Sequence, residues 1–479
     1  MRAAVALVVL ALGALEGGAV AAPPLKLVIG APQPPVADGE LGGTTIFLNR
    51  CVGGCTVRPG PDNSETDTSP LTQNQTTLAE FTFQPGEWEA TVACAKEVYS
   101  PYNVNVTDTR PTAGQNYTEI LVAGDPADLG LPNGVGGVAS VPANCQPNVK
   151  GVSFAFTSAI NIFAQEAGGS RVNGLCWIIA QETAHLYGLD HEYEFAEDAR
   201  SACNDPMTYR ADCGGEKFFR NRFAKCGETE ARPCNCPGYQ NSHAQMVKIF
   251  GAGQSIVPAP TVSVTTPLAN GALGAVVVAA AGSKRGVERV DFYLNGWKWS
   301  SQTGVAFTRQ GQPDPSSYTF VLPTNLPDSI YDIVVKAYDD IGTESVSDTV
   351  TVTKGAACQS AATCANGQKC ENGRCFWDPP VGEIGDDCTY AEFCKSNLCS
   401  GTADTQICTQ NCIPGVADSC PIDSGLECAE TSPGHGVCFP KDTGGGCCSV
   451  NGDGNGWVPG TFGAVVFGLI ALRPRRRRS

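Results

Sequence analysis

The pattern of apolar and polar positions divides the chain into a mixed N-terminal part, a strand-rich middle and a cysteine-rich end. In the N-terminal part, residues 88–98 and 175–186 carry apolar positions at helical spacing. Residues 104–107, 119–122 and 152–156 are short apolar runs. The first pattern predicts helices and the second predicts strands. This part of the chain is therefore expected to combine helices with a sheet.

The middle of the chain, residues 257–356, consists of short alternating runs bounded by Gly, Pro or Asn. The runs cover residues 261–265, 275–279, 290–294, 318–322, 330–337 and 349–353. Asn295-Gly296 between two such runs is a strong signal for a two-residue hairpin. Six or seven short strands in about 100 residues predict an antiparallel β-sandwich. The sequence from Val290 to the region of Lys336 also resembles bacterial Ig-like domains.

The cysteines are unevenly distributed. Of the 24, ten lie between Cys51 and Cys236 and twelve between Cys358 and Cys438. So many cysteines are typical of an oxidising compartment, and the even numbers suit disulfide pairing, although the pairing itself stays open. Residues 357–440 are therefore predicted to form a disulfide-stapled stalk. Metal binding is the alternative, which the absence of CxxC pairs disfavours.

Both ends carry targeting patterns. Residues 1–21 hold Arg2, an apolar run and Ala19-Val20-Ala21, which together predict a secretory signal peptide. Residues 456–472 are apolar and five arginines follow them, which predicts a short membrane helix with the arginines on the cytoplasmic side. With Cys447-Cys448 in a glycine-rich spacer, residues 441–479 resemble the MYXO-CTERM sorting signal of myxobacteria; a GPI signal is the second alternative.

These patterns predict an exported protein at the cell surface or outer membrane, held by the C-terminal helix before processing. Release into the medium is the alternative. The net charge of −16 excludes nucleic acid as a partner, because binding phosphates requires a basic face. The oligomeric state is left open. The expected order along the chain is a signal peptide (1–21), a mixed domain (22–256), a sandwich (257–356), a stalk (357–440) and a sorting tail (441–479).

The candidate chemistry lies between residues 177 and 209. Gln181 and His185 are four apart on a predicted helix, so they project from one face, and Glu182 stands beside them. Gly188 can adopt the left-handed conformation that ends a helix. Such a turn brings His191 back toward the same point. One helix and its exit loop therefore offer three potential metal ligands and a carboxylate.

This segment resembles the metzincin zinc-peptidase motif HExxHxxGxxH with its downstream Met-turn. The resemblance implies an α/β (α+β) catalytic domain over residues 22–256 that binds Zn2+ and cleaves protein or peptide substrates. Carried over position by position, the resemblance assigns the general base to Glu182 and the second and third zinc ligands to His185 and His191. It assigns the helix-ending glycine to Gly188, the Met-turn methionine to Met207 and the tyrosine beside the zinc to Tyr209.

One position departs from the motif, because the first zinc ligand is Gln181 where the family has His. A glutamine oxygen has comparable reach but is a poorer donor to zinc than imidazole, so a lower zinc affinity is expected. Both side chains are uncharged, so the site keeps the cation charge that acidifies water.

The function expected from this resemblance is a surface-anchored zinc endopeptidase that hydrolyses peptide bonds with zinc-activated water. A catalytically inactive relative acting in adhesion or recognition is the first alternative. A decoy that binds peptides without cleaving them is the second. Among neighbouring residues, His243 and Cys176 are expected to be structural, the latter in a disulfide. Asp190, Glu192 and Glu194 are expected to be solvated acidic residues, with a role in tuning or replacing a ligand as the alternative.

Overall fold

The computed structural model describes a chain of two compact units. The described residues are 25–195, 204–210, 215–236, 238–305, 315–401, 405–416, 419–421, 424–432 and 435–440. The first unit comprises Met1–Thr324 and Asp332–Val352, and the second comprises Asn325–Tyr331 and Thr353–Ser479. The predicted signal peptide and sorting tail lie outside the described residues. Within the described part, no helix combines the length and apolar character needed to cross a membrane.

The first unit begins with a domain built on a five-stranded sheet of order β6-β2-β7-β10-β8. Strands β6, β2, β7 and β10 run parallel, whereas β8 is antiparallel to β10 and forms one edge. The bounds are β2 Thr44–Asn49, β6 Val104–Thr107, β7 Tyr117–Val122, β8 Gly137–Val138 and β10 Val152–Ala155. Successive side chains alternate between the two faces, so Ile46 and Leu48 of β2 face one way and Phe47 the other.

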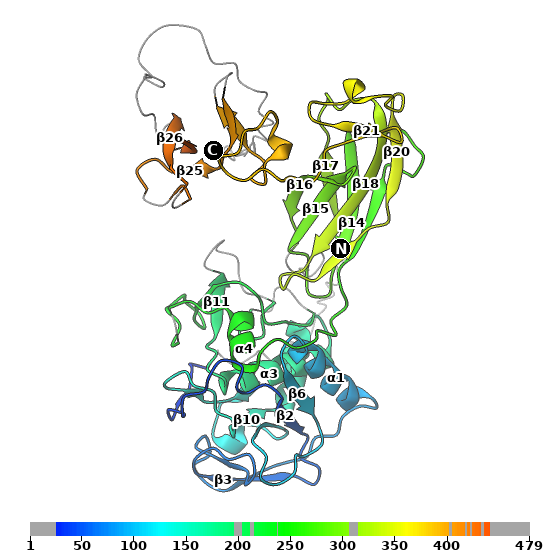
Figure 1. Cartoon of the computed structure of the whole chain (residues 1–479). Helices are drawn as coiled ribbons and strands as arrows, with labels where there is room; N and C mark the ends of the chain where they lie inside the picture. Colours follow the sequence, from blue (N-terminus) through cyan, green and yellow to red (C-terminus); the bar gives the residue numbers. More distant parts are fainter. Residues whose placement is uncertain are drawn as a thin grey trace, which may run out of the picture. The chain divides into compact units, whose positions relative to one another are not determined.

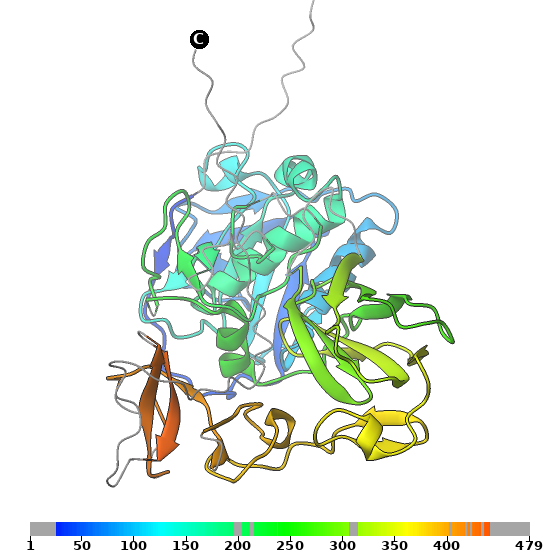
Figure 2. The ribbon, with the colours of Figure 1, turned by 90° about the horizontal axis from the view of Figure 1, so that it is seen from above.

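Helices α1 (Glu87–Tyr99) and α3 (Arg171–His185) pack on one face of this sheet and share a core with Ile46, Leu48 and Ile120 (Figure 1). Figure 2 shows α3 from above, running across the domain. The Cys94–Cys176 disulfide joins the two helices, as expected for Cys176.

Helix α3 begins four residues before the start predicted from the apolar run. Ser170 precedes it, and its hydroxyl accepts a hydrogen bond from the Asn173 amide at 3.1 Å, which is the capping that starts a helix. The apolar pattern did not include this first turn of the helix, because Gly174 interrupts the pattern. A Cβ there would lie 2.7 Å from the Phe163 backbone, so the glycine lets α2 (Ile160–Glu166) approach closely.

The opposite face of the sheet is covered by the excursion between β2 and α1, together with the N-terminal segment. The excursion contains β3, β4 and β5, and β1 pairs in parallel with β9. Two short strands and a helix complete the domain after α3. The bounds are β1 Ile29–Gly30, β3 Cys55–Pro59, β4 Thr68–Ser69, β5 Thr76–Leu78, β9 Val141–Pro142, β11 Glu192–Phe195, β12 Ala224–Cys226 and α4 Ser242–Phe250.

A β-sandwich follows, with a sheet of order β13-β14-β17 facing one of order β16-β15-β18-β19, to which β20 is added through β18. Phe292 and Phe320, from opposite sheets, stack with ring centroids 5.0 Å apart. Asn295 and Gly296 have φ values of 46° and 80°, which confirms the predicted hairpin. The bounds are β13 Thr261–Thr266, β14 Val276–Gly282, β15 Arg289–Leu294, β16 Trp297–Thr303, β17 Ser316–Val321, β18 Ser329–Tyr338, β19 Glu344–Val346 and β20 Val350–Lys354.

The cysteine-rich region of the second unit is a threefold repeat. Each repeat contains four cysteines, and in each the first pairs with the third and the second with the fourth. The pairs are Cys358–Cys370, Cys364–Cys375, Cys388–Cys399, Cys394–Cys408, Cys412–Cys428 and Cys420–Cys438. The strands are β21 Lys369–Glu371, β22 Arg374–Phe376, β23 Cys399–Gly401, β24 Gln406–Cys408, β25 Asn411–Cys412, β26 Leu426–Ser432 and β27 His435–Pro440.

Small β-sheets therefore predominate in the described residues, with few helices and a disulfide-rich C-terminal region. This confirms the expected multidomain, β-rich character and the disulfide-rich end. The sequence pattern missed the short strand β19, which has only three residues. The finer prediction of a metzincin-like core stays a prediction.

The Cys94–Cys176 disulfide is expected to stabilise the first domain strongly, because it closes a loop with a sequence separation of 82. In the chain-entropy model, replacing both cysteines with Ala lowers the free energy of unfolding by about 4.5 kcal/mol. The matched control is Cys51–Cys55, also buried but only four residues apart, for which the same model gives about 2 kcal/mol. Guanidinium unfolding of both double variants measures the difference. Equal losses would contradict the loop-length argument.

Candidate active site

The site is organised by the turn that follows α3. Gly188 has a φ of +88°, and its amide donates to the His185 carbonyl at 3.0 Å. A Cβ on Gly188 would lie 3.2 Å from the Cys145 carbonyl oxygen, so a side chain there would be both strained and crowded. The predicted left-handed turn is confirmed, and it reverses the chain directly after the helix.

The turn brings the two predicted histidine ligands together. Nε2 of His185 lies 2.9 Å from Nε2 of His191, and both side chains are buried. Nδ1 of His185 lies 2.7 Å from the Leu189 carbonyl oxygen. A carbonyl can only accept, so Nδ1 carries the proton and Nε2 of the neutral ring has a lone pair. Burial, with His191 beside it, lowers the pKa of His185 to about 3, so the neutral ring is favoured.

The same reasoning applies to His191. Its Nδ1 lies 3.0 Å from Glu228 Oε1, a carboxylate oxygen that accepts, so Nδ1 carries a proton and the neutral form of the ring has its lone pair on Nε2. With both rings neutral, two lone pairs face each other across 2.9 Å, and a proton or a metal cation between the nitrogens relieves their repulsion. Two nitrogens at about 2.0–2.1 Å from a tetrahedral zinc are about 3.3 Å apart, so the pair fits a shared metal closely.

Glu228 belongs to an ionic cluster behind His191. Arg232 donates to Glu228 at 2.8 Å and to both carboxylate oxygens of Asp190 at 2.6 and 2.8 Å. Asp190 in turn accepts from the His191 amide at 2.7 Å. Burial opposes ionisation of Glu228, but its hydrogen bonds with His191 and Arg232 outweigh it and lower its pKa to about 2.

Asp190, His191 and Glu228 place potential ligand atoms within 4.8 Å of one another. Arg232 already compensates both carboxylates, so we assign them to orienting His191 and not to binding a cation. Carboxylates that orient ligating histidines in this way are common around metal sites.

The sequence motif does not include Glu228 and Arg232, which lie well downstream of His191. The Cys226–Cys234 disulfide closes the short loop that carries both residues. Two nearby cysteines around an acidic and a basic residue were the signal that could have identified this loop. Gln240 also fixes the turn, since its amide exchanges hydrogen bonds with the Asp190 backbone at 2.7 and 3.0 Å.

Glu182 lies on α3 with 6% of its surface exposed. A Cβ on Gly137 would lie 2.5 Å from Glu182 Cγ, so this glycine of the edge strand β8 makes the space that the carboxyl group occupies. Burial raises the pKa of Glu182 to about 8.

Gln181 is also buried, one helical turn before His185. Its Nε2 has no hydrogen-bond partner among the described residues. Leaving a buried amide unsatisfied costs about 1–3 kcal/mol, so a group from outside the chain would be stabilised there. Rotating the amide by 180° puts its oxygen at the same place, since the two atoms are assigned only from their contacts.

The loop that carries Met207 and Tyr209 is held by Trp177, one turn before Gln181 on α3. Trp177 Nε1 donates to the Pro206 carbonyl at 2.9 Å. The Lys217 ammonium lies 3.2 Å from the Trp177 ring centroid and donates to two carbonyls of the same loop. Met207 is consequently fully buried.

Tyr209 lies against His191, with ring centroids 4.8 Å apart. Its hydroxyl lies 3.5 Å from the Leu25 carbonyl, at the start of the described chain. Burial, together with Glu182 and Glu228, raises the pKa of Tyr209, so the hydroxyl keeps its proton and is available as a donor.

The remaining candidate ligands have other partners. His243 Nδ1 lies 3.0 Å from the Tyr102 hydroxyl, consistent with a structural role. Glu192 accepts from Gln240, and Glu194 pairs with Lys225. The three clustered cysteine groups of the second unit consist of disulfide-bonded sulfurs, so they offer no thiolate to a metal.

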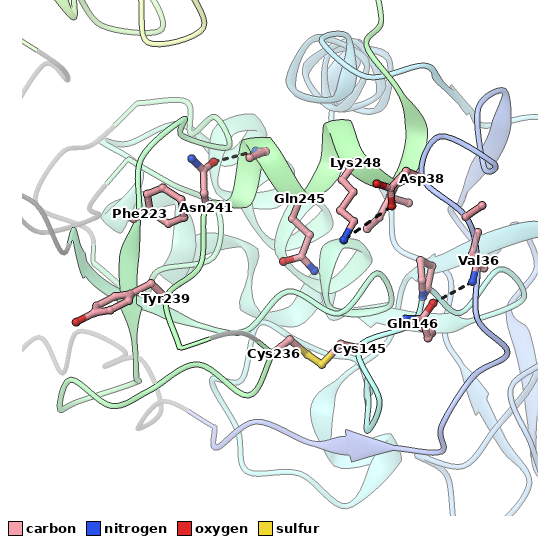
Figure 3. Close-up of a pocket in the computed structure, with 14 residues that line it drawn as sticks. Val36, Asp38, Cys145, Gln146, Phe223, Cys236, Tyr239, Asn241, Gln245 and Lys248 are labelled. Carbon is pink, nitrogen blue, oxygen red and sulfur yellow. Dashed lines mark hydrogen bonds and ion pairs between the residues drawn. A yellow bond between two sulfur atoms is a disulfide. The ribbon is translucent and has the colours of Figure 1, made fainter. Parts of the chain in front are cut away.

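A cavity of about 400 Å³ lies next to the Cys145–Cys236 disulfide, and its lining residues Cys145 and Gln245 lie beside Gly188. Figure 3 shows Phe223 and Tyr239 at one end and the Lys248–Asp38 pair at the other. Its lining includes none of the candidate metal ligands or catalytic residues. Gln245 connects the cavity to the turn, because its amide donates to the Tyr187 carbonyl at 3.2 Å.

No family model matches the chain, and none of the curated proteins matches it. Similar solved structures include the fibronectin(III)-like modules of Clostridium thermocellum CbhA, at 24% identity over 22% of this chain and half of that chain, with a TM-score of 0.16.

Two structures of OgpA from Akkermansia muciniphila are also similar. The wild type is 12% identical over 67% of this chain and 94% of OgpA, with a TM-score of 0.18. An inactive form in complex with the O-glycopeptide glycodrosocin is 11% identical over 68% and 94%, with a TM-score of 0.16. TM-scores this low do not establish a common fold.

Replacing Glu228 with Gln tests how the site is oriented. The variant keeps the shape of the side chain but removes the charge that fixes the His191 proton on Nδ1. We expect the dissociation constant for Co2+ to rise by about 10–100-fold, as is usual for such partners of metal-binding histidines. Glu194→Gln is the matched control, because Glu194 lies on β11 and pairs with Lys225 without touching either imidazole. Equal effects in both variants would contradict the assignment.

Proposed function

We propose that the first domain is a zinc-dependent peptidase of metzincin type. The observation that carries this proposal is the pair of buried imidazoles, whose Nε2 atoms face each other at 2.9 Å while both Nδ1 atoms are held by acceptors. Two histidines fixed in this way are a common metal-binding unit.

The donor set fits zinc, which prefers nitrogen ligands and tetrahedral geometry. His185 and His191 would hold the ion, with the Gln181 amide oxygen as a third donor. The unsatisfied position in the buried Gln181 side chain supports this assignment when the amide is rotated so that its oxygen lies there. When bound, zinc polarises a peptide carbonyl and lowers the pKa of a water molecule.

The protein's own residues supply the remaining chemistry. Burial favours the protonated form of Glu182, but a cation bound beside it would favour the carboxylate. A carboxylate oxygen of Glu182 would then take the proton of the attacking water and later deliver it to the leaving amine. The Tyr209 hydroxyl, which keeps its proton, donates to the oxyanion that develops on the substrate. Met207 and the loop around it form the buried floor next to Tyr209.

The fold agrees with this proposal. Helix α1 and strands β6, β7 and β10 follow one another along the chain in the order expected of a metzincin N-terminal subdomain. Helix α3, with Gln181, Glu182 and His185 in its last turns, follows as the active-site helix would.

The disulfides of both units support an extracellular protein. We propose that the signal peptide directs export, that the sandwich and the repeated disulfide modules act as spacer and stalk, and that the MYXO-CTERM-like tail provides anchoring at the cell surface. The substrate is a protein or peptide.

Gln181 favours a second candidate function, an inactive relative that binds proteins at the surface without cleaving them. An amide in place of imidazole weakens the helical ligand pair that first binds the metal. The retained Glu182 distinguishes the two functions, since a binding protein has no need of a general base beside the histidines.

The general base is tested by Glu182→Gln in the full chain. We expect Zn2+ to bind with unchanged stoichiometry, while kcat/KM for fluorescein-labelled casein falls by about 10²–10⁴-fold, as is typical when a general base is lost. Metal content and casein hydrolysis are measured on the same preparations. A wild-type protein that contains zinc but releases no peptides would support the binding protein and contradict the peptidase.

The identity of the first ligand is tested by Gln181→His. Imidazole is the better donor to zinc, so the affinity for Zn2+ is expected to rise by at least tenfold, or about 1.4 kcal/mol. Competition with a chromophoric chelator measures this change. An unchanged dissociation constant would indicate that residue 181 does not contact the metal.

A further inference from the structure

A buried ionic junction connects the first domain to the sandwich. Its centre is Asp340, in the turn after β18, whose side chain is 1% exposed. Arg285 donates to both of its oxygens at 2.7 and 3.0 Å, and Arg220 Nε lies 3.3 Å from Oδ2. Burial opposes ionisation of Asp340, but the two guanidinium groups outweigh it and hold its pKa below the usual range.

The junction binds the backbone of the first domain as well as its side chains. The Asn221 amide donates to Asp340 Oδ2 at 2.8 Å. Arg285 donates to the Phe219 carbonyl, and Arg220 donates to the Arg285 carbonyl. Residues 219–221 are therefore fixed by direct hydrogen bonds to and from the sandwich.

Residues 219–221 also support the loop that carries Met207 in the candidate site. The Arg220 amide donates to Asp205 Oδ2 at 2.7 Å, and the Met207 amide donates to Asp205 Oδ1 at 2.9 Å. The Met207 carbonyl accepts from the Glu192 amide at 2.8 Å, one residue after His191. Hydrogen bonds of 2.7–2.9 Å, joined by the intervening backbone, thus lead from Asp340 to the backbone next to His191, a predicted metal ligand.

A buried ion cluster of this kind contributes little net stability, because desolvation offsets much of the attraction, and apolar residues of similar volume often hold a contact equally well. The two parallel hydrogen bonds from the Arg285 guanidinium to the Asp340 carboxylate allow only one relative orientation of the two groups. We therefore explain the junction by the orientation that it fixes and not by a contribution to the free energy of unfolding.

We propose that Asp340 is a positioning residue of the candidate site, which acts through Arg220 and Asp205 to fix the Met207 loop. The sandwich is then a structural part of the peptidase unit as well as a spacer. The link to metal binding rests on the proposed function, whereas the link to the Met207 loop does not.

The test compares Asp340→Asn with Asp291→Asn in the full chain. Asp291 is a matched control, because it is a buried sandwich carboxylate between Arg289 and Lys298, and none of these three belongs to the first domain. Hydrogen exchange is followed in residues 204–210 and 215–222, and the Co2+ dissociation constant and visible spectrum are recorded. We expect Asp340→Asn alone to increase exchange in both segments, alter the spectrum and weaken Co2+ binding by about tenfold or more.

Exchange that is unchanged in Asp340→Asn, or that rises equally in Asp291→Asn, would overturn the proposal. So would faster exchange without any change in Co2+ binding. Should Asp340→Asn lack a cooperative unfolding transition, Arg285→Lys decides by the same measurements, since it keeps the charge but loses the two parallel hydrogen bonds. A wild type that binds no Co2+ would overturn the proposed function, and exchange alone then decides whether Asp340 fixes the loop.

Discussion

The left-handed turn at Gly188 is the constraint on which the candidate site depends. A helix places side chains in line along one face, and it cannot aim a later residue back at its own last turn. The positive φ of Gly188 reverses the chain and puts His191 Nε2 2.9 Å from His185 Nε2. The Leu189 carbonyl within this turn also fixes the His185 proton on Nδ1. One residue conformation thus sets the position of the histidine pair and the proton position of His185.

The turn alone does not hold the pair in place, and its supports come from other segments of the domain. Glu228 and Arg232 fix His191 from a loop closed by a disulfide. Trp177 holds the loop of Met207 from α3, and Lys217 holds it from the segment that follows the loop. The positions of these side chains depend on contacts between segments of the folded domain. The motif alone is therefore not sufficient to form the site.

This division explains which features the sequence could predict. Helix α3, the Gly188 turn and the Asn295-Gly296 hairpin depend on neighbours a few residues away, so local patterns were sufficient. Glu228 and Asp340 depend on disulfide closure and on domain packing, for which a single sequence carries no periodic signal. The start of α3 lay between these cases, because Ser170 is a local cap but Gly174 interrupts the apolar pattern for a reason found only in its packing against α2.

Gln181 would affect the affinity of the site for zinc without changing the charge of the bound cation. An amide oxygen binds zinc more weakly than imidazole, but it is equally neutral, so a bound cation would keep its full charge toward Glu182 and the substrate. A carboxylate at this position would have raised affinity while reducing that charge. The surrounding ionic groups follow the same logic, since Arg232 compensates Glu228 and Asp190 outside the histidine pair. If the proposed function holds, Gln181 would lower the affinity of the site for zinc while preserving the acidity of the bound cation, provided that Glu228 and Arg232 hold the histidine pair rigidly.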